Sequence, residues 1–509
     1  MSFRWSRRAA RRGSRVLLAL CAAILAVLWL VPAVRESDLS VTRMSSFRIP
    51  KRKLAPFARQ FESKLPVLEI VIAADSIPEP GQEPVPALMR VFDRPGGNRL
   101  TDPPTALLPF VRVRHRGASS MHSHYRQHSI RLNILDEKQK PSRFNLCGFP
   151  PDDDFVLIAT CMDRSLIRDR MAYELARPLM PFTPRAKFVE VFARKASDRL
   201  DERTYSGIYL AMEQIEEGPH RLDNGPLEMA DSPKGLEGGG WALQHDRPSS
   251  SLSSFRLGED SFTIVGPGSK KLTPEAADFI REDFARFQRL MKEDVFSETF
   301  FELLDVDSLV NMVLFQEFIK NVDAFQFSTY FYRRAGGRLV AGPPWDFNLT
   351  MGNARDLTSP EGFTLMTVPY SKEWMKNPRF FHLCQERWRE LRQAGGAFSD
   401  GRILDLIDAV VAEVEGAAPH HFGRYQELLR PERQFMFTAT YPVNSFEKHV
   451  RIVRDFLLRR AHWMDGALAA MKEPRELFSG EAEQAERNGE AAGTAWWKES
   501  ESPPLRRME

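Results

Sequence analysis

Several signatures of common enzyme and binding classes are missing from this 509-residue sequence. It contains no G-x-S-x-G elbow and no P-loop, so an enzyme with a serine or cysteine nucleophile has no support in the sequence. Lys and Arg number 71 against 68 Asp and Glu, and a formal net charge of +3 does not suggest a nucleic-acid binder. We therefore expect no nucleic-acid partner.

Cysteine is scarce, with four residues in the whole chain. Cys21 lies in an apolar run, and Cys147, Cys161 and Cys384 remain. In an oxidising compartment an odd number of cysteines leaves one thiol free or pairs it between chains. The spacing of Cys147 and Cys161 permits a disulfide, but nothing in the sequence shows that their Cβ atoms meet. Buried free thiols are the other interpretation.

Only one long uncharged hydrophobic run is present, at residues 16–34, and six arginines without any acidic residue precede it. As a helix it would span roughly 28 Å, close to the thickness of a bilayer core. The basic segment 1–15 should stay in the cytoplasm, so the rest of the chain would cross the membrane. The sequence therefore predicts a single-pass protein of a bacterial inner membrane. A cleaved signal peptide is the alternative.

The remaining composition is that of a globular protein, with 43% hydrophobic and 27% charged residues. A polar linker at 35–64 is followed by a β-rich part at 65–272 and a helix-rich part at 273–472. The tail 473–509 is rich in Glu, Gly and Ala and is expected to be disordered. Residues 218–260 are rich in Gly, Ser and Pro and are expected to form loops.

Alternating and helical patterns predict the elements of both parts. Asp163 is expected to cap a helix that runs to residue 177, before Pro178. Strands are expected at 65–73, 110–114, 129–135, 187–194 and 205–213, and helices at 273–292, 298–321, 372–393, 402–415 and 445–472.

The most informative stretch is 317–353, in which a hairpin at 329–343 turns at Gly336-Gly337. An antiparallel hairpin brings the start of its first strand beside the end of its second, so Asp323 and Asp346 should lie at the same edge. Two carboxylates about 5 Å apart repel by about 3 kcal/mol at an effective dielectric constant of about 20. A bound Mg²⁺ would relieve that repulsion, and phosphoryl transfer uses such a pair of aspartates. The alternative is that both residues cap local amides in turns.

Six short motifs in order resemble the spore-coat protein H (CotH) kinase-like family, and the match covers roughly residues 65–470. They are RHRGASS at 114–120, the strand 126–132, DRSLIR at 163–168, YSGIY at 205–209 with EQI at 213–215, NVD at 321–323 and WDFNLTMGN at 345–353. The set in this order is more specific than any one of its members.

The resemblance implies an α+β, atypical protein-kinase-like fold with a β-rich N-terminal lobe and a helix-rich C-terminal lobe, here behind one N-terminal transmembrane helix. It implies ATP and Mg²⁺ as cofactors. The Asp323 position is the catalytic aspartate of the family, and the Asp346 position binds the metal. With Asp346 we group Asn348 and Ser328 as metal ligands. The expected nucleotide-binding residues are Arg116, Gly117, Ser119, Ser120, Arg126, Arg131 and Glu213.

The sequence departs from the family pattern at places that bear on activity. The phosphate-binding lysine is missing, and its place falls to Arg126 or Gln127, with Arg131 as another candidate cation. Ser328 stands near the place of a metal-binding asparagine, and Asn348 replaces what is often an aspartate. Glu174 can pair with a phosphate-binding cation, as in kinases, or simply face solvent.

Two functions follow from these residues. The first is a membrane-anchored, ATP- and Mg²⁺-dependent kinase that phosphorylates an extracytoplasmic protein or envelope molecule. The second is a catalytically degenerate, kinase-like structural or interaction protein of the cell envelope. The sequence does not identify the acceptor or the oligomeric state.

Overall fold

The structure is a computed structural model. It describes residues 49–117, 121, 126–222, 239–247, 253–268, 271–364, 368, 370–433, 435 and 437–478. Among these residues, none of the helices has both the length and the apolar character needed to cross a bilayer. The run at 16–34 that we expected to cross the membrane lies outside the described residues. The transmembrane helix in the predicted fold class is therefore not supported by the structure.

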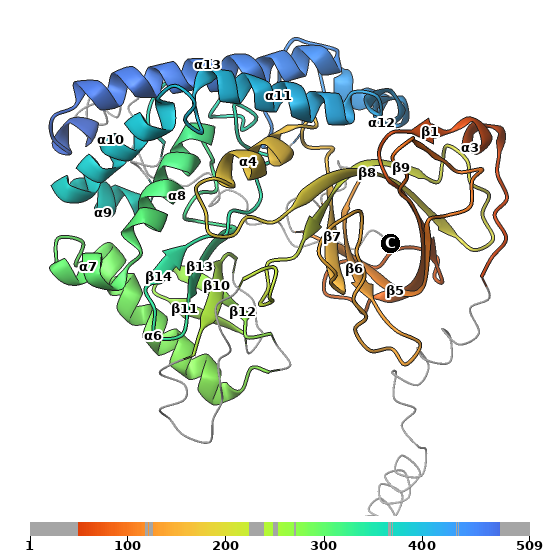
Figure 1. The fold of residues 1–509 in the computed structure, drawn as a ribbon, viewed down its shortest axis with the longest axis horizontal. Helices are drawn as coiled ribbons and strands as arrows, with labels where there is room; N and C mark the ends of the chain where they lie inside the picture. The colour runs from red at the N-terminus through yellow and green to blue at the C-terminus, as the bar shows by residue number, and fades with distance from the viewer. Residues whose placement is uncertain are drawn as a thin grey trace, which may run out of the picture. The chain divides into compact units, whose positions relative to one another are not determined.

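Seven strands between residues 67 and 213 form a closed barrel in the order β2-β3-β5-β6-β7-β9-β8 (Figure 1). All neighbouring strands are antiparallel except β2 and β8, which pair in parallel and close the barrel. The strands are β2 (Val67–Ile72), β3 (Val85–Phe92), β5 (Ala106–Arg116), β6 (Ser129–Ile134), β7 (Asp154–Ala159), β8 (Ala186–Lys195) and β9 (Tyr205–Glu213).

Strand β2 is buried on both faces, which explains why its sequence is apolar almost throughout. Leu68 and Ile70 belong to the main hydrophobic core. Val67, on the opposite face, packs in a smaller cluster with Phe92 and Phe192. The short helix α3 (Pro56–Gln60) adds Ala58 to this second cluster. The minor strands β1 (Glu62–Ser63) and β4 (Asn98–Arg99) form a separate antiparallel pair.

A second sheet of five strands has the order β11-β12-β10-β13-β14. Its strands are β10 (Trp241–His245), β11 (Ser254–Leu257), β12 (Asp260–Gly266), β13 (Thr329–Arg333) and β14 (Leu339–Ala341). The predicted hairpin is β13 and β14, with Phe331 opposite Ala341. Strand β10 pairs with β13 along its whole length, from Trp241 opposite Arg333 to His245 opposite Thr329.

This pairing corrects the predicted fold class. We expected one β-rich lobe before residue 273, but the strands divide between a closed barrel and a separate sheet. Three strands of that sheet lie at 241–266, largely where loops were predicted, and they pair with the hairpin from the helix-rich part. The two-lobe division was wrong because the hairpin lacks enough partners of its own and completes its hydrogen bonds with β10.

The helices lie beside the second sheet and α4, and two of them, α8 and α11, make the main helix contacts with α4 (Figure 1). They are α4 (Arg168–Ala176), α6 (Pro274–Lys292), α7 (Glu298–Leu303), α8 (Val306–Ile319), α9 (Ser371–Lys376), α10 (Pro378–Arg392), α11 (Asp400–Val414), α12 (Ala418–Arg424), the 3₁₀ turn η2 (Gln426–Leu429) and α13 (Phe446–Ala470).

Two of the predicted helices are each broken into two. The predicted helix 298–321 ends at Leu303, and Asp305 caps the next helix by accepting from the amide of Ser308 at 3.0 Å. The predicted helix 372–393 breaks at Asn377, whose side chain caps α10 while Pro378 takes its first position. Caps and a proline at the first position start new helices, so both breaks have a local cause.

The helix-rich part contacts the barrel through α12. The ring Nδ1 of His421 accepts from the amide of Ile208 at 3.1 Å, and the Tyr425 hydroxyl donates to the carbonyl of Ser206 at 3.0 Å. Gly207 lies between these two contacts with φ +91°. The YSGIY motif of β9 therefore forms the surface of the barrel on which α12 packs.

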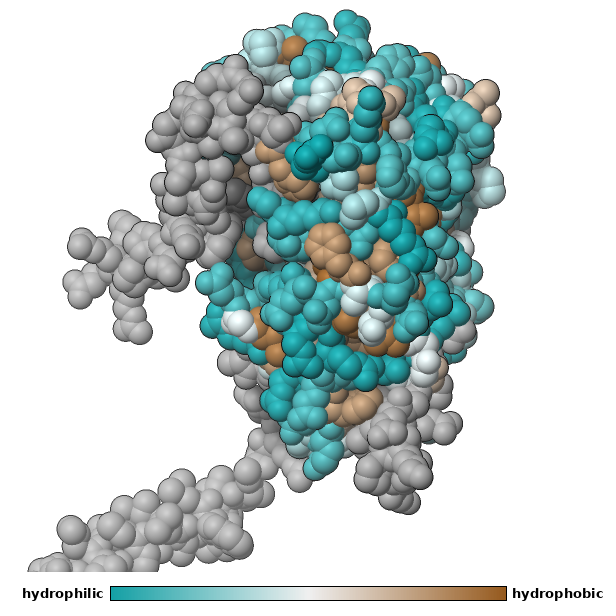
Figure 2. All heavy atoms as spheres, turned by 90° about the vertical axis from the view of Figure 1, so that its left-hand side faces the viewer, coloured by the Kyte–Doolittle hydropathy of each residue, from teal (hydrophilic) through white to brown (hydrophobic). Residues whose placement is uncertain are grey.

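Cys147, Cys161 and Cys384 are buried free thiols, so the disulfide between Cys147 and Cys161 does not form. On the face formed by the helices at the left of Figure 1, hydrophilic residues predominate and apolar ones are scattered between them (Figure 2). Such scattered apolar residues are usual on protein surfaces.

Candidate active site

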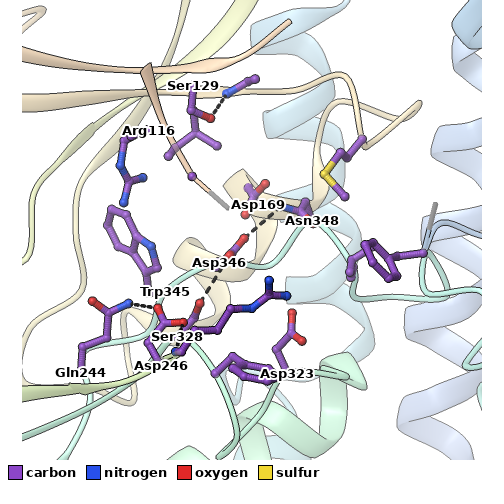
Figure 3. Close-up of a pocket in the computed structure, with 18 of the residues that line it drawn as sticks. Arg116, Ser129, Asp169, Gln244, Asp246, Asp323, Ser328, Trp345, Asp346 and Asn348 are labelled. Carbon is purple, nitrogen blue, oxygen red and sulfur yellow. Dashed lines mark hydrogen bonds between the residues drawn. The ribbon is translucent and has the colours of Figure 1, made fainter. Parts of the chain in front are cut away.

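A cavity of about 230 Å³ lies where the barrel, α4 and the second sheet meet. Its lining comes from the end of β5, from β6 and β7, from α4, from the end of β10 and from the loops on either side of the hairpin. Figure 3 shows carboxylates from three of these elements pointing toward the centre of the cavity. The most polar contributors are Arg116, Asp169, Gln244, Asp246, Arg247, Asp323, Ser328, Asp346 and Asn348.

Asp323 and Asp346 both line this cavity, as the hairpin geometry predicted. Asp323 lies in the turn after α8, where the side chain of Asn321 accepts from the Asp323 amide at 3.1 Å. Asn321 in the NVD motif thus shapes the turn that carries the aspartate. Asp346 follows β14 and has φ +66°, a left-handed conformation that is strained for a residue other than glycine.

The three predicted metal ligands lie together. The Asn348 amide donates to one oxygen of Asp346 at 2.9 Å, and the Ser328 hydroxyl donates to the other at 3.4 Å (Figure 3). Asp346 is therefore held from both sides by neutral groups. Neither contact neutralises its charge.

The electrostatics of the cavity are dominated by buried negative charge. Burial, together with the charge of Asp346, raises the pKa of Asp323 to about 7. Burial also raises the pKa of Asp346 above its usual range, although Arg116 partly opposes this shift. Asp169 has a pKa raised to about 8 by burial and by Asp346. Groups with such shifts are typical of functional sites.

Arg116 is the principal cation on the barrel side of the cavity. Its guanidinium lies over the ring of Trp345, 5.2 Å from the ring centroid, and its charge acts on Asp346. The guanidinium makes no hydrogen bond to any residue that the structure describes, so its N–H donors are available to a ligand. Arg247 provides a second cation, 5.6 Å from the Phe327 centroid, and its charge acts on Asp323.

The other predicted nucleotide-binding residues are distributed differently. Gly117 lines the cavity, whereas Ser119 and Ser120 lie outside the described residues. Arg126 pairs with Glu427 at 3.4 Å and does not line the cavity. Arg131 and Glu213 do not line it either, since Arg131 pairs with Asp154 and Glu213 pairs with Arg185 at 2.8 Å.

Gln127, one of the two candidates for the place of the missing lysine, forms hydrogen bonds with the barrel backbone. Its amide nitrogen donates to the carbonyls of Ser206 and Ile208, and its oxygen accepts from the amides of Thr160 and Cys161. This side chain is buried and has no donor left for a phosphate. The cation of the site therefore does not come from the strand position that the family pattern suggested.

Several cavity residues were not identified as site residues in the sequence, and four of them bear on the chemistry, namely Asp169, Tyr173, Asp246 and Arg247. Asp169 and Tyr173 lie four residues apart on α4, and that spacing was a signal that both share one helix face. Asp246 and Arg247 follow β10, a strand hidden in a segment rich in loop-forming residues. No local pattern linked them to the hairpin.

The donors present fit a magnesium ion bound together with phosphate. No group of three His, Cys, Asp or Glu side chains in the described part of the chain is arranged to hold a metal by itself. Mg²⁺ commonly uses only one or two carboxylates and takes its other ligands from water and nucleotide phosphates. Asp346 would supply a carboxylate, and Asn348 and Ser328 would supply neutral oxygens.

Two buried aspartates beside the guanidinium of Arg116 resemble the arrangement of aspartates and a cation in protein-kinase-like sites. Comparison with known families agrees with this class. The profile described as CotH kinase protein matches residues 113–464, well over half of the chain. The chain therefore belongs to the CotH kinase family and is a kinase-like protein. None of the curated proteins matches it.

Proposed function

We propose that this protein is an ATP- and Mg²⁺-dependent phosphotransferase. The observation that carries the proposal is that Asp323, Asp346 and Arg116 come from three distant parts of the chain and line one cavity. Positioning and electrostatic stabilisation are the main contributions that a protein makes to phosphoryl transfer. The cavity offers groups for both.

Each of these residues has a distinct role in the proposal. Asp323 accepts the proton of the acceptor hydroxyl, and a pKa of about 7 suits a general base near neutral pH. Arg116 binds phosphate oxygens with donors that make no hydrogen bond to the described residues. Asp346 would hold a magnesium ion, with Asn348 and Ser328 beside it, and the ion would supply positive charge against the charge that develops on the phosphates.

The location and the acceptor are proposed on the sequence alone. We propose that the acceptor is a protein or another envelope molecule outside the cytoplasm. Only the sequence before residue 49 supports this location. In the cavity, the charge of Arg116 acts on Asp346 and that of Arg247 acts on Asp323. These two cations are compatible with a phosphorylated or acidic group near either aspartate.

The proposal is tested by thermal unfolding of the full chain with ATP and Mg²⁺. Ligand at 100 times its Kd stabilises the native state by about 2.7 kcal/mol. We expect the wild type to gain melting temperature only when both are present, and Asp346→Asn to lose that gain. Asp408→Asn is the control, since Asp408 pairs with Arg454 at the surface. Identical melting curves for wild type and Asp346→Asn would refute the proposal.

A degenerate scaffold is the second candidate, and one observation favours it. Gln127 uses its donors and its acceptor within the barrel, while Arg126 pairs with Glu427 and Arg131 pairs with Asp154. None of the three candidate positions for the missing lysine lines the cavity. The two candidates differ in catalysis. Transfer of labelled phosphate to a partner by the wild type, abolished in Asp323→Asn, would eliminate the scaffold.

A further inference from the structure

The backbone around Asp346 is held by helix α4. The amide of Asp346 donates to the hydroxyl of Tyr173 at 3.2 Å, and the amide of Phe347 donates to Asp169 Oδ1 at 2.8 Å. These are consecutive amides of the strained segment, in which Asp346 has φ +66°. Left-handed backbone of this kind persists only where its surroundings fix it.

Asp169 and Tyr173 can act together because they lie four residues apart on one face of α4. The Tyr173 ring is 1% exposed and lies 5.3 Å from the Phe347 ring, so its hydroxyl has little freedom to move. The carboxylate of Asp169 also faces the cavity beside Asp346 and Asn348 (Figure 3). Both acceptors are therefore fixed by their helix.

Arg168, at the start of α4, adds hydrogen bonds between this helix and the loop that follows Asp346. Its guanidinium donates to the carbonyl of Thr350 at 3.1 Å and to that of Met351 at 3.3 Å. Asp163 fixes this arginine, because its carboxylate pairs with the Arg168 guanidinium and accepts from the Arg168 amide at 2.8 Å. The DRSLIR motif thus joins α4 to residues 350 and 351.

The usual kinase device at this place is a lysine–glutamate ion pair that must form for activity. Here the carboxylate of Glu174 pairs with Arg170 and Arg177 on its own helix. Of the two candidates for the lysine position, Gln127 bonds to barrel backbone and Arg126 pairs with Glu427. The residues that the structure describes therefore connect α4 to the metal-binding segment by direct hydrogen bonds.

We propose that Asp169 and Tyr173 are positioning residues that set the direction of the Asp346 carboxylate by binding the amides of residues 346 and 347. In this protein the two hydrogen bonds take the place of the lysine–glutamate pair in linking the helix to the site. The inference rests on the proposed function only in that Asp346 binds a metal. A displacement of α4 would then move Asp346 through these two hydrogen bonds.

The first test measures amide hydrogen exchange of the segment 345–351 in the full chain without ligand. Asp169→Ala removes the acceptor for the Phe347 amide, and we expect exchange there to rise about tenfold. Asp169→Asn keeps an oxygen in the same place and should exchange like the wild type. Glu174→Gln, on the solvent side of α4, is the matched control and should also leave exchange unchanged.

Tyr173→Phe gives an independent variant if Asp169→Ala fails to fold. It keeps the buried ring and removes only the oxygen that accepts from the Asp346 amide, so exchange at residue 346 should rise. Unchanged exchange in Tyr173→Phe, or in a folded Asp169→Ala, would overturn the positioning role. Equal losses in Asp169→Asn and Asp169→Ala would also overturn it, because the charge of Asp169 would then matter rather than its hydrogen bond.

The second test measures binding of Mn²⁺, as a stand-in for Mg²⁺, with a non-hydrolysable ATP analogue. We expect Asp169→Ala to weaken Mn²⁺ affinity about tenfold, as loss of a supporting group around a metal site commonly does, and Asp169→Asn to stay within about twofold. Unchanged affinity in Asp169→Ala would overturn the inference. If the wild type binds neither Mn²⁺ nor analogue, the proposed function fails, and the exchange experiment still decides the positioning role.

Discussion

Replacing Gly207 with alanine should loosen the contact between α12 and the barrel. A Cβ at this position would lie 2.8 Å from His421 Nδ1, 2.9 Å from Tyr425 Cε2 and 3.1 Å from Gln127 Nε2. All three belong to buried or nearly buried side chains that already bond to β9. The backbone is also at φ +91°, which an L-residue rarely adopts.

The two effects can be estimated separately. A left-handed backbone conformation costs an L-residue about 1–2 kcal/mol. Forcing extra volume into a packed site costs about 1–3 kcal/mol more. If His421 moves away, the Ile208 amide also loses its acceptor. We therefore expect Gly207→Ala to lower the free energy of unfolding by about 2–5 kcal/mol.

Gly81→Ala is the matched control for this prediction. Gly81 has φ +87°, nearly the same as Gly207, but nothing lies within 4 Å of its added Cβ. It should therefore show the backbone effect alone, about 1–2 kcal/mol or less. Urea unfolding of wild type and both variants, followed by tryptophan fluorescence, measures the difference. If Gly207→Ala were no less stable than Gly81→Ala, the packing of α12 on β9 would be refuted.

Three further predictions concern stability and reactivity. The hydrogen bond to Glu190 raises the pKa of His420 above its usual 6.5, so its stabilising effect is complete below pH 6.5 and is lost as the pH rises through the raised pKa. A melting series from pH 6 to 9 should show this loss in wild type, and a slope of the same size in His420→Gln would contradict it. Arg460→Met should cost about 3–5 kcal/mol in urea unfolding because it removes the buried guanidinium that pairs with the buried carboxylate of Glu317. Exposed Arg454→Met should cost about 0–1 kcal/mol, and equal losses in the two variants would contradict this prediction. Burial raises the pKa of the three described thiols, so iodoacetamide at pH 8 should label them only after unfolding, as mass spectrometry of native and denatured samples would show.

The sequence was most informative where local chemistry dictates geometry. The Gly336-Gly337 turn predicted the hairpin, and antiparallel pairing then placed Asp323 and Asp346 at one cavity. Helix α13 was predicted within two residues at either end because Ser445 caps it and its apolar pattern is long. In these places a few neighbouring residues determine the structure.

The sequence was least informative where partners come from far along the chain. Strand β10 exists because β13 and β12 supply its hydrogen bonds, and its own short stretch resembled a loop. Closure of the barrel depends on the parallel pairing of β2 with β8, which no local pattern encodes. For the same reason Asp246 could not be connected with Asp346, although both line the cavity.

The proposed phosphate-binding arginine could not be singled out from the sequence for the same reason, because its partners come from distant parts of the chain. Arg131 had the right strand pattern, but Asp154 on the adjacent strand β7 takes its guanidinium. Arg116 has no described acid in hydrogen-bonding contact and instead lies over Trp345. Which of the two arginines lines the cavity is decided by the position of β5 beside the loop that follows β14, and the sequence does not reveal that position.

The most direct test of this account is a crystal structure of the protein with Mg²⁺ and a non-hydrolysable ATP analogue. We predict a metal ion about 2.1 Å from an oxygen of Asp346, with phosphate oxygens against Arg116 and the terminal phosphate facing Asp323. A nucleotide bound away from this cavity, or a cavity that stays empty at saturating ligand, would contradict the proposed phosphotransferase.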